Sequence, residues 1–357
     1  MKRRREGLYA SMTTPTGSDS TLSSTPGVRS SISDGTVGAN HSPAGIGSTR
    51  RQFSHHEFPV STLLALKGHT TVSVVLPARN EAATVGAIVA NIHAELVQSG
   101  VVDELVVIDD HSADDTAAVA EAAGATVVAA SEVLASFGRG HGKGEVLWKS
   151  LAVTTGEIVL WCDADIKEFD SRFLRGLLGP MLADPTIYFT KGFYRREERD
   201  GVGGGRVTEL AARPLLSMYF PALTDIHQPL SGEYGGRRTH LEQVPFVGGY
   251  GVDVGLLISL SQRFGIEGIA QIDLEVRHHR NRPLTELAPQ AAAVAQTIVQ
   301  MTPSASAPQQ FTITPAGAEP SNIQYLLRPP MAEVRESLAF EAEFGGDPIP
   351  LVAVPAT

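Results

Sequence analysis

Short apolar runs alternate with segments of helical spacing between residues 72 and 161. The expected strands of this part cover residues 72–77, 104–110, 126–128 and 158–161, and the expected helices cover residues 58–67, 81–96, 115–123 and 143–152. Apolar, β-branched runs of this length are typical of buried strands, and strands that alternate with helices predict βαβ units around a parallel sheet. We therefore expect an α/β fold with a Rossmann-like, mostly parallel sheet flanked by helices.

The chain of 357 residues changes character toward both ends. Residues 1–55 form a Ser-, Thr- and Gly-rich tail with too few apolar side chains to offset the entropy of ordering, so we expect disorder there. A regulatory tail, or a true start at Met12, are open alternatives. Residues 56–170 form one half of the expected domain, residues 171–300 a second half, and residues 301–357 a Pro- and Ala-rich arm that is extended or partly disordered.

The second half has a less regular pattern than the first. Helices are expected over residues 173–182, 208–216 and 252–264, and strands over residues 188–193 and 269–276.

Charge and cysteine content exclude several functions. A formal net charge of -10 opposes nucleic-acid binding, which normally needs a basic domain or stripe. Cys162 is the single cysteine, so neither an intramolecular disulfide nor a multi-cysteine zinc site can form. No apolar stretch approaches the ~20 residues that span a bilayer, and the basic start lacks the apolar segment of a signal peptide. These features predict a cytoplasmic protein without a membrane span.

Two carboxylates, Asp163 and Asp165, follow the apolar run at residues 158–161. Because side chains alternate along a strand, residues two apart project to the same side. Hard oxygen donors at this spacing suit Mg²⁺ or Mn²⁺, ions that keep positions open for phosphate oxygens. The pattern indicates a metal-dependent site for a nucleoside diphosphate, and an acidic turn after a strand is the simpler alternative.

Polar segments also follow the first two expected strands, at the edge where such sheets bind ligands. The segment at residues 77–81 lacks the glycine-rich turn of dinucleotide-binding enzymes, which argues against an oxidoreductase. Glu81 either accepts hydrogen bonds from a ribose or a base, or is an acid favoured at a helix start. At least one of Asp109 and Asp110 is expected to face the ligand.

Three further segments carry positive charge. A glycine-rich turn brings Lys143 to the start of an expected helix, where phosphate or a base edge can bind. Gly205 and Arg206 follow two further glycines, so this loop either approaches an anion closely or is simply flexible. The basic run at residues 277–283 contains His279. A histidine there can complete a metal site while the arginines take up phosphate charge. The alternative is that the run is a solvated surface.

Taken together, these segments resemble the glucosyl-3-phosphoglycerate synthases, which are retaining glycosyltransferases of the GT-A fold. The resemblance extends from about residue 72 to 165 and from 191 to about 287. It is carried by residues 74–78, 142–145, 204–210, 228–234, 249–252 and 279–284, and residues 328–331 are similar too. It implies transfer of glucose from a nucleotide sugar to 3-phosphoglycerate, with UDP-glucose as the favoured donor.

The resemblance also implies roles for individual residues. Contacts to the nucleotide sugar are implied for Pro77, Ala78, Arg79, Glu81, Asp110, Lys143, Asp163 and Ala164. Contacts to the acceptor are implied for Gly205, Arg206, Val207, Thr208 and Asn281. Asp165 and His279 would ligate Mg²⁺, with Mn²⁺ as a substitute, and the catalytic group would comprise Asp163, Asp165, Arg206 and Asp253. Residues 56–170 would thus bind the donor and residues 171–300 the acceptor.

Three residues depart from the family pattern. Arg79 replaces an apolar residue, Asp110 a serine and Asp253 a longer acid, and all three lie on the donor side. The choice of donor therefore stays open, and transfer of mannose from GDP-mannose is the nearest alternative. A sugar nucleotidyltransferase would share the sheet and the metal, whereas a nucleotide-sugar sensor would bind without turnover. The family further implies a homodimer. The expected binding partners are the nucleotide-sugar donor and the 3-phosphoglycerate acceptor.

Overall fold

The computed structural model describes residues 51–138, 140–198, 201–202, 205–278, 283–303 and 307–344. The described residues all belong to one compact unit, Ser48–Thr357. Among the described helices, none combines the length and the apolar character needed to cross a membrane.

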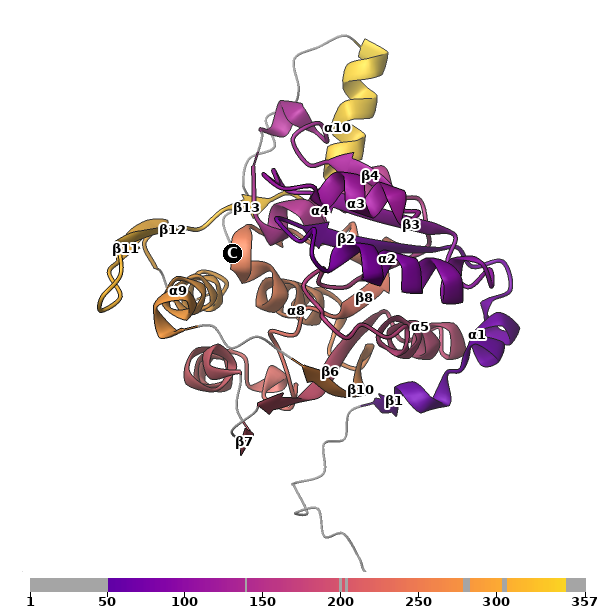
Figure 1. Cartoon of the computed structure of the whole chain (residues 1–357). Coiled ribbons are helices and arrows are strands. Elements are labelled where there is room, and N and C mark those ends of the chain that lie inside the picture. Colours follow the sequence, from indigo (N-terminus) through magenta and orange to yellow (C-terminus); the bar gives the residue numbers. More distant parts are fainter. Residues whose placement is uncertain are drawn as a thin grey trace, which may run out of the picture. The chain divides into compact units, whose positions relative to one another are not determined.

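A nine-stranded sheet forms the centre of this unit (Figure 1). Its strand order is β1-β10-β6-β8-β5-β2-β3-β4, and β7 pairs with β6. The strands are β1 (Gln52–Ser54), β2 (Val72–Ala78), β3 (Glu104–Asp109), β4 (Thr126–Ala129), β5 (Ile158–Trp161), β6 (Phe189–Glu198), β7 (Gly201–Val202), β8 (Tyr234–Arg237) and β10 (Ile269–His278). Neighbours pair in parallel except where β8 joins β5 to β6 and where β7 joins β6. The expected mostly parallel sheet is thereby confirmed.

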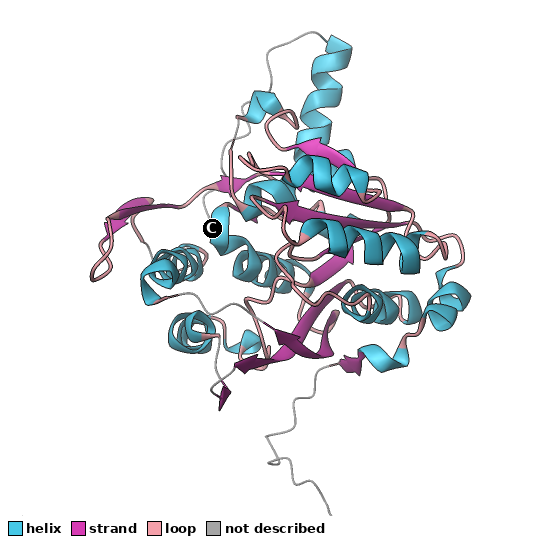
Figure 2. Cartoon of the chain, viewed as in Figure 1, coloured by secondary structure: helices cyan, strands magenta, loops and turns pink. Residues whose placement is uncertain are grey.

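Helices cover both faces of this sheet (Figure 2). They are α1 (Val60–Lys67), α2 (Val85–Ile92), α3 (Thr116–Ala122), α4 (Lys143–Val153), α5 (Arg172–Ala183), α6 (Arg213–Tyr219), α7 (Arg238–Leu241), α8 (Val252–Phe264), α9 (Leu284–Gln300) and α10 (Met331–Phe344). One apolar core contains residues from α1, α2, α3 and α5, and the other contains residues from α4, α6, α8, α9 and α10. In β2, Val74 and Leu76 belong to the first core and Val75 to the second, as strand alternation requires.

The first half of the domain follows the expected alternation closely. The strand expected at residues 158–161 coincides with β5, and in the second half the helix expected at residues 252–264 coincides with α8. The helix expected from residue 81 begins only at Val85, because the preceding residues form a turn, and it continues as a π-helical segment, His93–Val97.

Strand β8 is the main element that the sequence pattern did not predict. Its core is Gly235-Gly236, which carries no apolar alternation, yet it lies between β5 and β6 in the middle of the sheet. Gly235 pairs with Leu160, and a Cβ at Gly235 would lie 2.8 Å from the carbonyl oxygen of Val159. The close approach of neighbouring backbone therefore requires glycine here.

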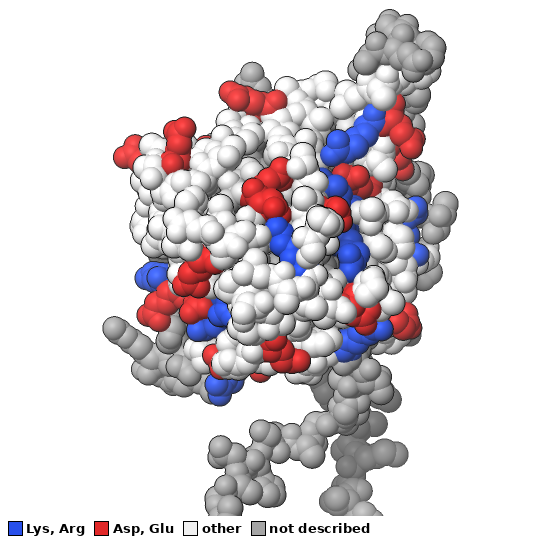
Figure 3. All heavy atoms as spheres, turned by 90° about the vertical axis from the view of Figure 1, so that its right-hand side faces the viewer, with Lys and Arg blue, Asp and Glu red and all other residues white. Residues whose placement is uncertain are grey.

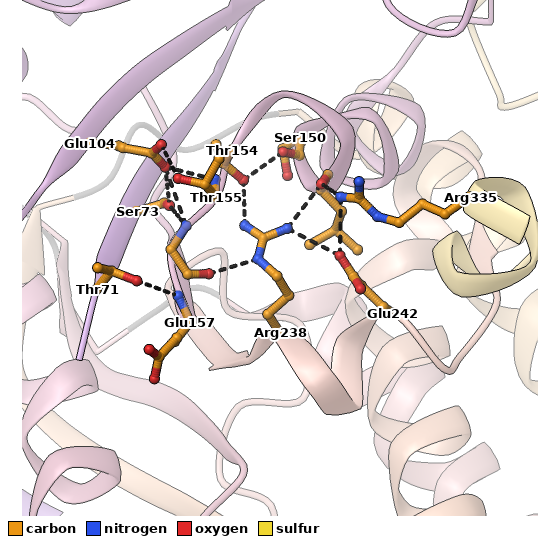
Figure 4. Close-up of polar contacts among 12 residues, drawn as sticks. Thr71, Ser73, Glu104, Ser150, Thr154, Thr155, Glu157, Arg238, Glu242 and Arg335 are labelled. Atoms are coloured by element: carbon orange, nitrogen blue, oxygen red, sulfur yellow. Dashed lines mark hydrogen bonds and ion pairs between the residues drawn. The ribbon is translucent and has the colours of Figure 1, made fainter. Parts of the chain in front are cut away.

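A polar network fixes the strand ends opposite the candidate site (Figure 4). Arg238, directly after β8, donates to the carbonyl oxygens of Gly156 at 2.7 Å and Leu151 at 2.9 Å and to Thr154 Oγ1 at 2.7 Å. Arg335 of α10 donates to the same Leu151 carbonyl at 2.8 Å. One guanidinium thus holds β8 against the loop that enters β5, and a second docks α10 beside it.

The segment after residue 306 contains more regular structure than the expected arm. It forms a hairpin of β11 (Gln310–Ile313) and β12 (Ser321–Gln324), the strand β13 (Leu327–Arg328), which pairs with β9 (Phe246–Val247), and α10. Met331 and Val334 of α10 are buried in the second core. The expectation of an extended arm missed this docked helix, because its buried contacts come from distant segments.

Candidate active site

Asp163 and Asp165 lie in a turn just beyond β5, which ends at Trp161. Both reach the same nitrogen of Arg277: Nη2 is 3.6 Å from Asp163 Oδ2 and 2.9 Å from Asp165 Oδ1. A Cβ on Gly232 would collide with the Asp163 carboxylate, so the backbone before β8 closes against it. The two acids share one side, as expected, although a turn and not the strand places them there.

Arg277 of β10 is the positive centre of this group. Its Nη1 lies 2.7 Å from Oε1 of the fully buried Glu233 and donates to the Tyr194 hydroxyl at 2.8 Å. Burial lowers the pKa of Arg277, but the charges of Glu233 and the two aspartates outweigh burial and raise it well above its ordinary value. The basic run was expected to take up phosphate charge; the charge of Arg277 is instead already balanced by carboxylates.

Lys143, the first residue of α4, forms a second positive centre. Its Nζ lies 2.9 Å from Asp163 Oδ1 and 3.1 Å from Asp253 Oδ1 in the first turn of α8. The Tyr234 hydroxyl donates to the same Asp253 oxygen at 2.8 Å. Although burial lowers the pKa of Lys143, the two aspartates raise it well above its usual range. Lys143 therefore stays charged and joins the starts of two helices.

Lys191 of β6 is the third cation of the group. It is 1% exposed, donates to the Ser231 carbonyl at 2.9 Å, and lies 4.1 Å from the centre of the Tyr234 ring. Burial lowers its pKa to about 8, since the attraction of Asp253 does not compensate for lost hydration. This lysine carries a proton far less firmly than Lys143 does.

The pKa values of two acids in this group shift in opposite directions. Burial raises the pKa of Asp163, but Lys143 and Arg277 outweigh burial and hold it well below its usual range. Burial and the neighbouring Asp163 raise the pKa of Glu233 despite the charge of Arg277. Four carboxylates, those of Asp163, Asp165, Glu233 and Asp253, thus surround the three cations Lys143, Lys191 and Arg277. When all seven groups are ionised, one negative charge is in excess.

Several of the residues expected to contact the donor lie at the carboxyl ends of β2 and β3. Pro77 and Ala78 end β2, and the Ala78 carbonyl accepts from the Asp110 amide at 2.8 Å. The buried Asp110 carboxylate accepts from the Gly142 amide at 2.8 Å, which ties β3 to the glycine turn before Lys143. Arg79 is largely exposed, and its Nη1 lies 3.8 Å from Asp110 Oδ2.

Glu81 connects to the aspartate turn through one threonine. Thr84 Oγ1 donates to the Ala164 carbonyl at 2.7 Å and lies 3.3 Å from Glu81 Oε2. The Glu81 amide donates to Thr116 Oγ1 at 2.8 Å, at the start of α3. Glu81 therefore belongs to the same edge of the sheet as Asp163.

The expected acceptor residues belong to another segment. Gly205, with φ +74°, precedes Arg206, Val207 and the buried Thr208, and its carbonyl accepts from the Glu209 amide at 2.8 Å. The π-helical segment Thr208–Ala212 that follows packs against α9. His279 and Asn281, expected for metal and acceptor, lie outside the described residues, as do Gly203 and Gly204.

The family model for glycosyl transferase family 2 matches residues 73–232. The glucosyl-3-phosphoglycerate synthase of Mycolicibacterium smegmatis is 45% identical over 297 residues, which cover 80% of this chain and 97% of the relative. The chain belongs to the glucosyl-3-phosphoglycerate synthase family. It is therefore a glycosyltransferase, and the resemblance seen in the sequence is confirmed.

Solved structures of related proteins agree with this membership. The glucosyl-3-phosphoglycerate synthase of Mycobacterium tuberculosis, in complex with Mn²⁺, UDP-glucose and phosphoglyceric acid, matches at a TM-score of 0.75 with 41% identity, covering 81% of this chain and all of that one. A mannosyl-3-phosphoglycerate synthase from Rubrobacter xylanophilus matches at 0.73 with 36% identity, covering 80% of this chain and 97% of that one. Glucosyl and mannosyl enzymes thus share this fold.

For this member of the glucosyl-3-phosphoglycerate synthase family, sequence reasoning missed part of the polar centre. Glu233 and Tyr234 lie at the start of the unpredicted β8, and Lys191 lies in β6. The register explains why they meet: Tyr234 pairs with Trp161 on one side and with Lys191 on the other. A buried lysine within an expected strand was the one local signal, since lysine is rarely buried without a partner.

Charge on one face of the molecule is mixed. On the side of α1 and α2, at the right of Figure 1, Lys and Arg are interspersed with Asp and Glu (Figure 3). This face carries no broad basic stripe of the kind that tracks a nucleic-acid backbone.

Proposed function

We propose that the protein transfers glucose from UDP-glucose to 3-phosphoglycerate with retention of configuration. The observation that carries the proposal is the charged centre at the end of β5, where Asp163, Lys143 and Asp253 contact one another. It lies at the carboxyl ends of parallel strands, where sheets of this class bind nucleotides. The likeness over 97% of a glucosyl-3-phosphoglycerate synthase supports the choice of substrates.

The donor set fits a hard divalent cation. Carboxylate oxygens are the ligands that Mg²⁺ and Mn²⁺ prefer, and the centre has one carboxylate more than its cations balance. Asp165 is the most open of these acids, with 38% of its side chain exposed, so it can still bind an ion while it contacts Arg277. We assign Asp165 and His279 as ligands. The bound ion supplies positive charge to the diphosphate as it leaves the sugar.

The chain's own residues position the donor. Asp163 is ionised throughout the physiological range because Lys143 and Arg277 hold its pKa low, so it can accept hydrogen bonds from ribose or sugar hydroxyls. Pro77, Ala78 and Arg79 border the nucleotide, and Asp253 faces the sugar. The 3-phosphoglycerate hydroxyl then attacks the anomeric carbon on the face that the nucleotide leaves. The bond from this carbon to the diphosphate breaks, and the hydroxyl proton passes to the departing phosphate, so no separate protein nucleophile is needed. Gly205, Arg206, Val207, Thr208 and Asn281 hold the acceptor.

The proposal is tested by product analysis. The purified full chain is incubated with UDP-glucose, 3-phosphoglycerate and Mg²⁺, and the product is examined by mass spectrometry and by NMR of its anomeric proton. We expect a phosphorylated glucosylglycerate with the α configuration of the donor, and its loss on addition of EDTA. Absence of this product with every nucleotide sugar tried would refute the proposal.

Transfer of mannose from GDP-mannose is the second candidate. It is favoured by the likeness to the Rubrobacter xylanophilus enzyme, whose name gives a mannosyl product, and by the exposed Arg79 beside the nucleotide edge. The proposal further includes a cytoplasmic location and a homodimer. Sedimentation equilibrium measures the dimer directly, and a monomer at micromolar concentration would contradict it.

A further inference from the structure

A second group of possible metal ligands lies outside the charged centre. His55 and His56 belong to the short 3-10 helix His55–Glu57 after β1, and Glu275 belongs to β10. His56 Nε2 is 2.8 Å from Glu275 Oε1, and His55 Nε2 is 3.3 Å from Glu275 Oε2. One ligand atom from each residue lies within 4.8 Å of the other two. We call this group the His-His-Glu cluster.

His55 is unusual because it is buried with incomplete hydrogen bonding. Its side chain is 6% exposed, its Nδ1 makes no hydrogen bond to any described residue, and its Nε2 has only the 3.3 Å contact to Glu275 among the described residues. A surface ion pair between His56 and Glu275 would contribute little to stability, and it does not explain why a second imidazole is buried against the same carboxylate. Unsatisfied buried nitrogens are destabilising unless another group binds them.

The backbone at Glu275 has a left-handed conformation within a bulge of β10. The pairing of β10 with β6 shifts register between Asp273 and Val276, and Glu275 within this bulge has φ +65°. Its amide is held by Asp273 Oδ1 at 2.8 Å. A left-handed conformation disfavours a residue with a side chain and is kept only where its surroundings impose it.

We propose that the His-His-Glu cluster binds a divalent transition metal ion of the Zn²⁺ class. Two imidazoles and one carboxylate are a common zinc ligand set with a fourth position for water, and a second imidazole makes the set suit Zn²⁺ better than Mg²⁺, which takes mainly oxygen ligands. Bonds of about 2.1 Å in tetrahedral geometry put neighbouring ligands about 3.4 Å apart, close to the 3.3 Å between His55 and Glu275. Small side-chain shifts therefore complete the site.

The surroundings of the cluster permit a cation. Burial lowers the pKa of His55, so its imidazole is neutral and able to ligate near pH 7. Arg172 of α5 is the positive neighbour that also lowers this pKa. Its Nη2 donates to the Val276 carbonyl at 2.9 Å, and its Nη1 lies 3.9 Å from Asp170 Oδ2. The charge of Arg172 is thus directed partly away from the cluster.

An ion here would join the beginning of the domain to an edge of its sheet. The 3-10 helix follows β1, which pairs with β10, and Glu275 stands two residues before Arg277. The ion would fix the bulge that leads into the charged centre, so its role would be structural and separate from group transfer.

Zinc binding to the full chain tests the proposal, with excess Mg²⁺ present to occupy the catalytic site. The variants are His56→Ala and Glu275→Gln, and the control is His69→Ala, which removes an exposed histidine outside the cluster. We expect one Zn²⁺ bound by the wild type and by the control, with at least tenfold weaker binding in both variants. Co²⁺ should give the absorption bands of a tetrahedral site in the wild type and in the control, and should not give them in His56→Ala or Glu275→Gln.

Two results would overturn the proposal. One is equal Zn²⁺ affinity in the wild type, His56→Ala and Glu275→Gln. The other is a loss of Zn²⁺ in Asp165→Asn while both cluster variants retain it, which would place the ion in the catalytic centre. Thermal unfolding in EDTA checks that the variants fold; added Zn²⁺ should raise the Tm of the wild type and not that of Glu275→Gln.

Discussion

Arg277 allows three carboxylates to lie close together in the protein interior. Its guanidinium contacts Glu233, Asp163 and Asp165, and the side chain is 4% exposed. Removing a buried charge from water costs several kcal/mol, which only well-placed opposite charges offset. Lys143, and after it Arg277, hold the pKa of Asp163 low, so its readiness to accept hydrogen bonds depends in part on Arg277.

Replacing Arg277 should therefore be strongly destabilising. We expect Arg277→Gln to lower the free energy of unfolding by about 3–5 kcal/mol, because buried carboxylates lose their counter-charge. Arg263→Gln, at an exposed position at the end of α8, should change it by less than about 0.5 kcal/mol. Denaturant unfolding at pH 7 measures both. Adding Glu233→Gln to Arg277→Gln should recover part of the loss, and equal stabilities of the two single variants would contradict this account.

Lys191 should give stability a pH dependence above neutrality. Its folded pKa of about 8 lies below the ordinary 10.5, so between these values the unfolded chain binds a proton that the folded chain has lost. The free energy of unfolding then rises with pH through this window, by up to about 3 kcal/mol, and the penalty is constant below pH 8. The stability difference between wild type and Lys191→Met should therefore shift in favour of the wild type from pH 7 to 10. A constant difference would place the pKa near its ordinary value.

Arg206 should act on the acceptor and not on the donor. Its guanidinium suits the carboxylate and phosphate of 3-phosphoglycerate, and it precedes a helical segment that packs against α9, apart from β5 in the sequence. We expect Arg206→Ala to raise the apparent KM for 3-phosphoglycerate at least tenfold while UDP binding stays nearly unchanged. Calorimetry with UDP and steady-state kinetics separate the two effects. An equal loss of UDP affinity would place Arg206 on the donor side.

At the scale of elements, β13 connects the end of the chain to the donor-binding turn. Arg328 makes a bidentate contact with the fully buried Glu145 of α4, at 2.6 Å and 2.9 Å, and Trp148 donates to the Pro329 carbonyl at 2.8 Å. Glu145 lies two residues after Lys143, so the position of α4 depends on residues almost two hundred positions later in the chain.

Loss of Arg328 should loosen both partners of this contact. We expect Arg328→Met to increase hydrogen exchange in residues 140–153 and 327–344, with local opening easier by about 3 kcal/mol. The reason is that, among the described residues, Glu145 then retains only Lys149, at 3.2 Å, as a counter-charge. Affinity for UDP-glucose should fall as well. Arg263→Met, at the exposed end of α8, is the matched control and should leave exchange near Lys143 unchanged. Unaltered exchange in Arg328→Met would show that the arm does not support α4.

The sequence predicted those elements whose signal is local. Strand β5 and helix α8 were found within their bounds because their own apolar patterns suffice. Strand β8 was missed because its glycines are chosen by the neighbouring strands and not by a pattern of their own. The acids after β5 were found for the same local reason, whereas Glu233 and Lys191 join the centre only through strand register. Arg277 was seen as basic but assigned to phosphate, because its burial cannot be read from a run of charges.

At the scale of the whole described domain, one antiparallel strand joins two parallel sets of strands. The set β5-β2-β3-β4 carries the donor-side residues, and the set β6-β10-β1 carries Lys191 and Arg277, with β8 between them. The charged centre forms where the two sets meet, so the ion pairs of Lys143 and Arg277 with their acids depend on one junction.

Donor competition tests the central claim most directly. The wild-type chain is given equal concentrations of UDP-glucose and GDP-mannose with Mg²⁺, with and without 3-phosphoglycerate, and the released nucleotides are separated and quantified. We predict release of UDP that depends on 3-phosphoglycerate and exceeds release of GDP at least tenfold. Release of GDP in excess of UDP, or no release of either nucleotide that depends on 3-phosphoglycerate, would contradict glucose transfer from UDP-glucose by this protein.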